Sequence, residues 1–219
     1  MQVEIKGKPS FAYLEVELAG GESIVAESDA MATMAGPIDM QTRLNGGLIG
    51  GLLRKFLGGE SLFINEFTNK ASEPAAITLA QKYPGDVNCI ELNGNSMYLQ
   101  PGAFIAAEPG VKLGLSWAGI VSWLGREGLF RLVVSGQGRC WYGAYGALLD
   151  REVDGETVVD TSHLVAYDPG VKLKAQLAGG LFSSFFGGEG LVTRLEGKGH
   201  YVIQTRSVSG LAAWLNPKF

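Results

Sequence analysis

The chain is poor in the residues that build disulfide-rich and many catalytic proteins. It has two cysteines and two histidines in 219 residues. Two cysteines are too few for a disulfide scaffold, and Cys89 and Cys140 each lie in a strand-like run, so we expect buried free thiols. Free thiols indicate a reducing compartment. Because the N-terminal MQVEIKGKPSF also lacks a signal-peptide pattern, we expect a cytoplasmic location.

Positive charge is scarce as well. The chain carries 18 Lys and Arg against 22 Asp and Glu, for a net charge of −4 and an isoelectric point near 5.3. A basic surface is what attracts nucleic acid and anionic lipid, so we expect no nucleic-acid partner. No apolar run reaches the ~20 residues that a membrane-spanning helix requires.

Motifs for metal binding and nucleophilic catalysis are also absent. His163 and His200 stand apart, without the His-x-His, His-Glu-x-x-His or Cys-x-x-Cys spacing of a metal site, so we expect no cofactor. No Gly-x-Ser-x-Gly elbow occurs. In the glycine-rich stretch GGLIGGLLRKFLGGE (residues 46–60), Phe56 follows Lys55 where a phosphate-binding loop needs Ser or Thr. These absences favour a protein that is not an enzyme, with both histidines at surface or strand-pairing positions.

Glycine is abundant, at 32 residues, roughly twice its ordinary usage. Few prolines and many Val, Leu, Ile and aromatic residues accompany it. Tight turns need the positive φ that glycine adopts readily, so this composition predicts many short strands joined by turns. Period-2 alternation in Ala12–Leu18 supports this reading, and Asn93-Gly94 and Asp154-Gly155 are expected to be turns between strands. The predicted fold class is all-β.

Three copies of one pattern run along the chain. A Gly-polar-hydroxyl motif opens an apolar run at residues 21–25, 94–98 and 155–159, and PGVKL occurs at both 109–113 and 169–173. The near-constant spacing predicts one compact unit of three internal repeats, approximately 1–81, 82–143 and 144–219. Each repeat is expected to be a small antiparallel β-sandwich or roll, packed around a pseudo-threefold axis. A linear solenoid is the alternative, although solenoid repeats are usually shorter.

Each copy also contains an apolar connector between two predicted strands. Apolar pairs at i, i+1 and i+4 predict a short helix in each connector. Such connectors either cap the fold and complete its core, or form a patch that contacts a second subunit, a partner protein or a membrane surface. Homo-oligomeric contact is the preferred interpretation. The candidate interaction residues are Leu48, Ile49, Leu52, Leu53, Phe56, Leu57, Ile120, Trp123, Leu124, Leu181, Phe182, Phe185 and Phe186.

One acidic position follows each connector: Glu60, Glu127 and Glu189. Around a threefold axis, these three carboxylates could form a candidate acidic cluster that holds a cation or shares protons. The alternative is a polar residue at a turn before a strand.

Nearly the whole chain resembles a known family. The resemblance is strongest from about residue 138 to 215, through GAYGA (143–147), VDTSHLVAY (159–167), GKGHYVIQTRS (197–207) and Trp214-Leu215. These segments look like the Altered Inheritance of Mitochondria 24 family, which comprises bacterial proteins of unknown function and mitochondrial relatives. That family is grouped with the TRAP-like (tryptophan RNA-binding attenuator protein-like) β-sandwich superfamily. The resemblance implies an all-β fold of repeated TRAP-like units, often oligomeric, and carries over no catalytic residue.

We therefore expect a non-enzymatic, homo-oligomeric binding or scaffold protein that contacts an unknown protein partner or the periphery of a membrane. The alternative is a small-molecule-binding or hydrolytic enzyme with a site between repeats, using His163, His200 and nearby carboxylates. A pocket lined by convergent polar groups would favour the enzyme, and a flat apolar face would favour the scaffold.

Overall fold

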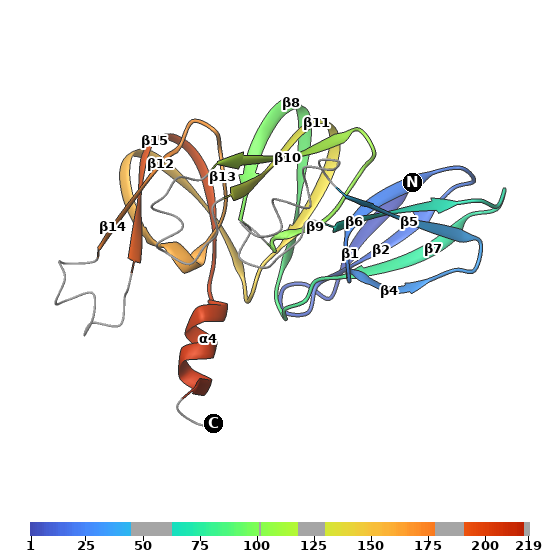
Figure 1. The fold of residues 1–219 in the computed structure, drawn as a ribbon, viewed down its shortest axis with the longest axis horizontal. Helices are drawn as coiled ribbons and strands as arrows, with labels where there is room; N and C mark the ends of the chain where they lie inside the picture. The colour runs from blue at the N-terminus through green and yellow to red at the C-terminus, as the bar shows by residue number, and fades with distance from the viewer. Residues whose placement is uncertain (45–62, 101, 118–129, 178–190, 217–219) are drawn as a thin grey trace.

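The chain is all-β in a computed structural model that describes residues 1–44, 63–100, 102–117, 130–177 and 191–216. Within these residues, a single-turn 3₁₀ helix and one short α-helix are the helical elements (Figure 1). This confirms the predicted fold class.

The strands fall into three consecutive groups along the chain. The first group is β1 (Gln2–Lys6), β2 (Tyr13–Leu18), β3 (Ser23–Glu27), β4 (Met31–Met34), β5 (Ile38–Leu44), β6 (Phe63–Asn69) and β7 (Ala75–Ala80). The second is β8 (Val87–Leu99), β9 (Phe104–Ala107), β10 (Val111–Trp117) and β11 (Phe130–Gly143). The third is β12 (Leu148–Asp160), η2 (Thr161–His163), β13 (Leu164–Tyr167), β14 (Lys172–Leu177) and β15 (Leu191–Gln204), followed by α4 (Val208–Leu215).

Two antiparallel sheets contain all of these strands. A four-stranded sheet has the order β1-β2-β7-β4. An eleven-stranded sheet has the order β12-β15-β13-β8-β11-β9-β3-β6-β5, with β10 added on β11 and β14 on β15. The larger sheet therefore runs through all three groups.

The pairing of strands follows the same order in each group. In the second group β11 pairs with β8, β9 and β10, and in the third β15 pairs with β12, β13 and β14. In the first group each long strand is divided in two, so β2 pairs with β7, β3 with β6, β4 with β7 and β5 with β6. The register of the short strand passes over one residue in all three groups: Ala32 in β4, Ile105 in β9 and Val165 in β13.

Two expected turns are wrong. Gly94 and Gly155 lie inside the continuous strands β8 and β12, where they adopt φ values of 89° and 105°. A glycine at positive φ kinks a strand without ending it when the partner strand follows the bend. Here β8 remains paired with β11 on both sides of Gly94, with a register shift between Ser135 and Gln137 of β11.

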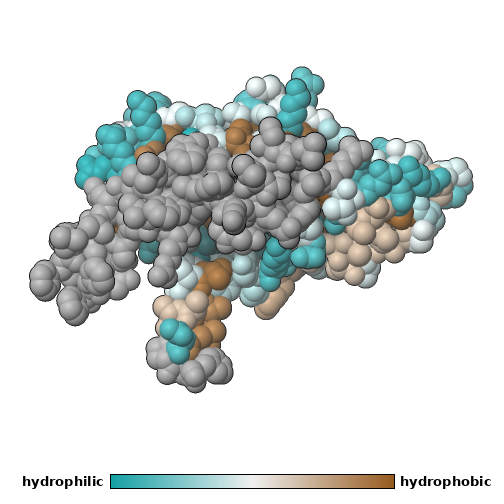
Figure 2. Space-filling model, viewed as in Figure 1, coloured by the Kyte–Doolittle hydropathy of each residue, from teal (hydrophilic) through white to brown (hydrophobic). Residues whose placement is uncertain are grey.

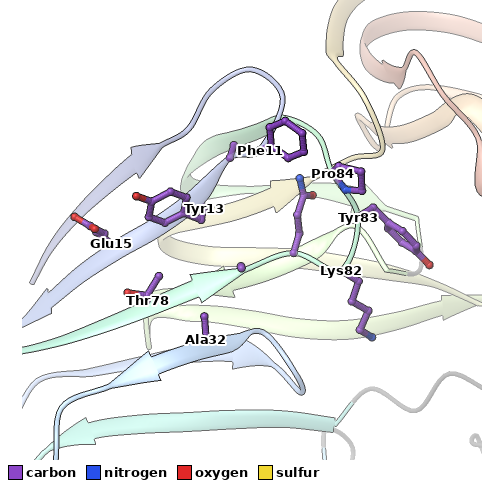
Figure 3. A pocket seen from close by; sticks show the side chains of 11 residues that line it. Phe11, Tyr13, Glu15, Ala32, Thr78, Lys82, Tyr83 and Pro84 are labelled. Atoms are coloured by element: carbon purple, nitrogen blue, oxygen red, sulfur yellow. The ribbon is translucent and has the colours of Figure 1, made fainter.

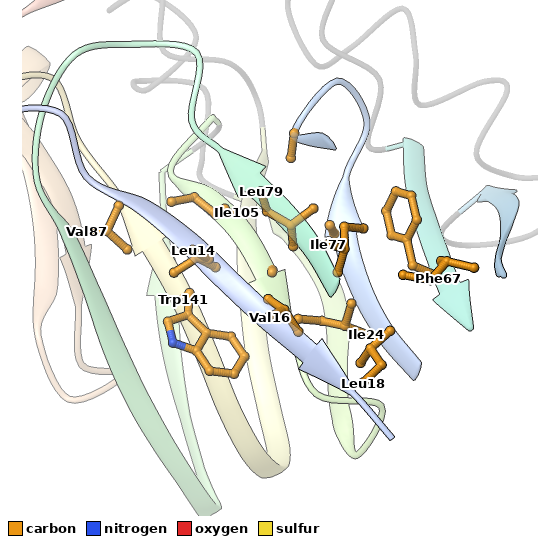
Figure 4. Packing of buried hydrophobic residues seen from close by; sticks show 14 of the residues in the cluster. Leu14, Val16, Leu18, Ile24, Phe67, Ile77, Leu79, Val87, Ile105 and Trp141 are labelled. Carbon is orange, nitrogen blue, oxygen red and sulfur yellow. The ribbon is translucent and has the colours of Figure 1, made fainter. Parts of the chain in front are cut away.

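The hydrophobic core forms three clusters, and neighbouring groups contribute to the same cluster. Figure 4 shows Leu14, Val16 and Leu18 of β2, whose alternate burial confirms the period-2 prediction, packed with residues of β7. Trp141 of β11 is part of this cluster, so the second group helps to cover the core of the first. Such fully buried apolar side chains each contribute about 1.5–3 kcal/mol to folding.

The third group covers the second in the same manner. Val165 and Ala166 of β13 and Val202 of β15 belong to the cluster formed mainly by β8, β9 and β11. The third cluster consists of residues of the third group, with Tyr98 of β8 packed against it.

The predicted pseudo-threefold arrangement is not confirmed. In Figure 1 the three groups follow one another along the longest axis, with β5 and β4 toward one end and β12, β14 and β15 toward the other. The division into repeats 1–81, 82–143 and 144–219 as one compact unit stays a prediction. The three connectors that were expected to be helical lie outside the described residues.

Candidate functional site

The candidate interaction residues and the candidate acidic cluster chosen from the sequence lie outside the described part of the chain. The thirteen apolar residues and Glu60, Glu127 and Glu189 fall within 45–62, 118–129 and 178–190. The structure therefore tests neither the apolar patch nor the acidic cluster, and both stay predictions.

The structure does describe the strands that flank these three segments. Segment 45–62 connects β5 to β6, 118–129 connects β10 to β11, and 178–190 connects β14 to β15. The strands of each pair are antiparallel, and their last registered partners are Leu44 and Phe63, Trp117 and Phe130, and Leu177 and Leu191. Each apolar segment thus begins and ends at the same point of the pairing scheme.

An arginine lies close to one of these points. Arg131, near the start of β11, places its guanidinium 3.8 Å from the ring centre of Tyr98 on β8. Its Nη1 donates a hydrogen bond of 2.5 Å to the Tyr167 hydroxyl on β13. The rings of Tyr98 and Tyr167 are 5.2 Å apart. This cluster links the second and third groups where β8 and β13 pair.

The two histidines have separate surroundings. Nδ1 of His163 is 2.6 Å from the backbone oxygen of Gln204. His200 is exposed, with Asp150 and Glu152 each 3.6 Å from one of its ring nitrogens. His200 lies in β15 and its backbone nitrogen donates to Asp168 at 2.8 Å, which agrees with a strand-pairing position. Within the described ranges, no three His, Cys, Asp or Glu side chains are grouped closely enough to hold a metal ion.

The two thiols differ. Cys140 is a buried free thiol, as predicted, and burial raises its pKa far above the usual value. Cys89 is free but exposed, so its expected burial is wrong. Although the residue is exposed, the neighbouring protein partly desolvates the Cys89 thiol and so raises its pKa. Both thiols are therefore held in the protonated, weakly nucleophilic form.

A pocket of about 570 Å³ lies on the first group, on the face of the four-stranded sheet opposite the core (Figure 3). Tyr13 and Glu15 of β2, Ala32 of β4 and Thr78 of β7 line its floor. Phe11, 74% exposed, stands at its rim. Neither histidine lines this pocket, so it is not the site with His163 and His200 that the enzyme alternative assumes.

Sequence reasoning did not select the C-terminal helix α4, which extends away from the sheets in Figure 1. Val208, Leu211 and Trp214 are all exposed, and Figure 2 shows apolar surface along this helix. The sequence does contain the pattern of an apolar helix face, because these residues are spaced i, i+3 and i+6. Ser207 is also a typical N-cap, and its hydroxyl accepts a hydrogen bond from the backbone nitrogen of Gly210. No helix among the described residues is long and apolar enough to span a bilayer.

Comparisons with known proteins cover nearly the entire chain. An uncharacterized protein, M6_Spy0233, of Streptococcus pyogenes serotype M6 is 26% identical over 224 residues, which is 98% of this chain and 90% of that protein. The crystal structure of protein SPYM3_0169 from Streptococcus pyogenes superimposes with a TM-score of 0.81 at 25% identity, covering 100% of this chain and 99% of that one. The family model described as "Mitochondrial biogenesis AIM24" matches residues 3–206. The chain therefore belongs to the AIM24 family.

Proposed function

We propose that this protein is a non-enzymatic, homo-oligomeric binding or scaffold protein built from three TRAP-like repeats. Its apolar segments 45–62, 118–129 and 178–190 contact a partner protein or the surface of a membrane. Its two free thiols are consistent with work in a reducing compartment such as the cytoplasm.

The position of the apolar segments is the observation that carries this proposal. Each segment joins the ends of two paired strands, and the three pairs β5–β6, β10–β11 and β14–β15 occupy the same place in the pairing scheme. The same pairing scheme occurs in three groups of strands, and each group carries an apolar segment at the same point of that scheme. Such a protein presents one kind of contact three times. Repeated weak contacts combine into a strong one through effective concentration.

The chemistry of the described side chains supports a non-enzymatic role. A catalytic base or nucleophile needs a suitable pKa and a free approach to substrate. His163 faces a backbone oxygen, and Cys140 is buried with a raised pKa. These groups have the surroundings of structural side chains.

The test replaces one aromatic side chain in each apolar segment, in the triple variant Phe56→Ser, Trp123→Ser and Phe185→Ser. The control is Phe11→Ser, which removes an exposed phenylalanine from another surface. Flotation with phosphatidylcholine–phosphatidylglycerol vesicles tests membrane contact. A photo-crosslinking amino acid at position 123, compared with one at position 11, tests contact with a partner protein in cells.

We expect the triple variant to lose vesicle flotation that the control variant keeps, or the crosslinking amino acid at position 123 of the otherwise wild-type chain to capture a defined protein that position 11 does not. A wild-type protein that neither floats nor crosslinks from position 123 would contradict the proposed contact role.

A further inference from the structure

We infer that copies of this chain associate head to tail, by pairing strand β4 of one copy with the outer edge of β12 of the next. This inference rests on the proposed oligomeric role and specifies the interface. It follows from two kinds of strand edge, each of which is paired inside the chain in two of the three groups. One kind is left open in the first group, and the other is left open in the third.

The first edge belongs to the short strand of each group. β9 lies between β11 of its own group and β3 of the first group, where Val25 pairs with Ala107 and Ala26 with Ala106. β13 likewise lies between β15 and β8, where Tyr98 pairs with Tyr167. β4 is the corresponding strand of the first group, and among the described strands it pairs with β7 alone.

The second edge belongs to the strand that receives this pairing. β3 receives β9, and the end of β8 receives β13. The corresponding end of β12, residues 157–160, pairs with β15 on one side and with no described strand on the other. A strand edge with unpaired backbone groups is a template for pairing with another chain.

Residues at the same place in different groups are buried where a neighbouring strand group packs on them and exposed where it does not. Every residue of β9 and of β13 is buried, whereas β4 is exposed or half-buried throughout, with Met34 38% exposed. Ile24 of β3 is fully buried, and Val158, at the same place in β12, is 51% exposed. Apolar side chains thus occur at both open edges where a following or preceding group would bury them.

Figure 1 indicates why a single chain does not close these edges on itself. β4 lies toward one end of the long axis and β12 toward the other. Two different surfaces that fit each other form a heterologous contact, which adds further copies until a ring closes or a filament grows. The partner of each edge is therefore a second copy of this chain.

The internal pairs also define the register between copies. Val25 with Ala107 and Tyr98 with Tyr167 are equivalent pairs in the scheme. The corresponding pair between copies joins Val159 of β12 to Met34 of β4, in antiparallel orientation. The next pair joins Asp160 to Thr33.

The test uses Met34→Lys and Val158→Lys in the full-length chain, with Met40→Lys as the matched control. Met40 is 43% exposed on β5, an edge strand whose counterparts β10 and β14 are also at the margin of the sheet. Sedimentation velocity gives the mass of each species, and circular dichroism verifies that each variant is folded.

We expect the wild type and Met40→Lys to be oligomers, and Met34→Lys and Val158→Lys to be monomers. Each of these two variants keeps one intact edge, so an equimolar mixture should form a 1:1 dimer that grows no further. If the wild type is a monomer, both this inference and the proposed oligomeric role fail. If the wild type is an oligomer that both variants leave unchanged, or if the mixture stays monomeric, the head-to-tail interface is wrong while the oligomeric role stands.

A crosslink tests the register without a disruptive charge. Met34→Cys and Val159→Cys are introduced together in a Cys89→Ser background, since Cys140 is buried. We expect a disulfide between copies on mild oxidation, and none when Met40→Cys replaces Met34→Cys. Equal crosslinking from positions 34 and 40 would overturn the register.

Discussion

At the scale of single residues, the Arg131 cluster shows what a sequence pattern does not contain. Arg131, Tyr98 and Tyr167 belong to three strands that are far apart in the chain, and they meet only because β11 and β13 both pair with β8. The guanidinium combines a cation–π contact with a hydrogen bond to a tyrosine hydroxyl. No spacing along the chain predicts this meeting, because it depends on strand order.

Replacing this arginine should destabilise the fold. We expect Arg131→Ala to lower the free energy of unfolding by about 2 kcal/mol, since both the cation–π contact and the charged hydrogen bond are lost. Arg151→Ala is the control, because Arg151 is exposed and its guanidinium donates to the backbone oxygen of the adjacent Asp150. Urea unfolding followed by tryptophan fluorescence measures both, and equal losses in the two variants would contradict this role for Arg131.

Tyr142 gives a prediction for alkaline pH. Burial raises its pKa to about 12, whereas an unfolded tyrosine titrates near ~10. A group whose pKa is higher in the folded state stabilises the fold below its unfolded pKa and loses that contribution as the pH rises. We therefore expect the free energy of unfolding to fall from about pH 10 upward, at up to ~1.4 kcal/mol per pH unit for this residue.

The variant Tyr142→Phe removes that titration. Its stability should decline less steeply than that of the wild type between about pH 10 and 12 in urea titrations. The decline should not vanish, because the buried Cys140 thiol also has a raised pKa. A slope identical to that of the wild type would show that the Tyr142 hydroxyl does not titrate differently in the folded state.

At the scale of elements, the strands were more predictable than the breaks between them. Alternating burial of Leu14, Val16 and Leu18 follows from period 2, because one face of β2 packs on the core. The Asn-Gly and Asp-Gly pairs predict turns, because such pairs usually form turns. In β8 and β12 a partner strand bends with the chain, so the glycine kinks the strand and pairing continues.

A side chain at position 155 should lower the stability of the fold, for conformational reasons alone. Apart from Gly155 itself and its two chain neighbours, no atom lies within 4 Å of the place that its Cβ would occupy, but its φ is 105°. We expect Gly155→Ala to lower the free energy of unfolding by about 1–2 kcal/mol. Gly36 has equally open space without a positive φ, so Gly36→Ala should change stability by less than about 0.5 kcal/mol. Comparable effects of the two substitutions, measured by thermal unfolding, would contradict this account of the kink.

At the scale of the whole molecule, the sequence predicts a recurring pattern of strands. It does not predict how the three groups of strands are arranged in space. The recurring motifs predicted strands with recurring roles, and β9 and β13 lie in corresponding places of the pairing scheme. Whether the groups surround one axis or form a row depends on how each short strand pairs with the preceding group. That contact involves two residue pairs at each junction, such as Val25 with Ala107, and no motif marks it.

The native mass of the full-length chain in solution tests the central claim most directly. Sedimentation velocity is measured for the wild type, for Met34→Lys and Val158→Lys, and for an equimolar mixture of the two variants. An oligomeric wild type, two monomeric variants and a 1:1 dimer in the mixture are the result that head-to-tail scaffold assembly predicts. A wild type that sediments as a single 23.3 kDa chain at all concentrations would contradict it.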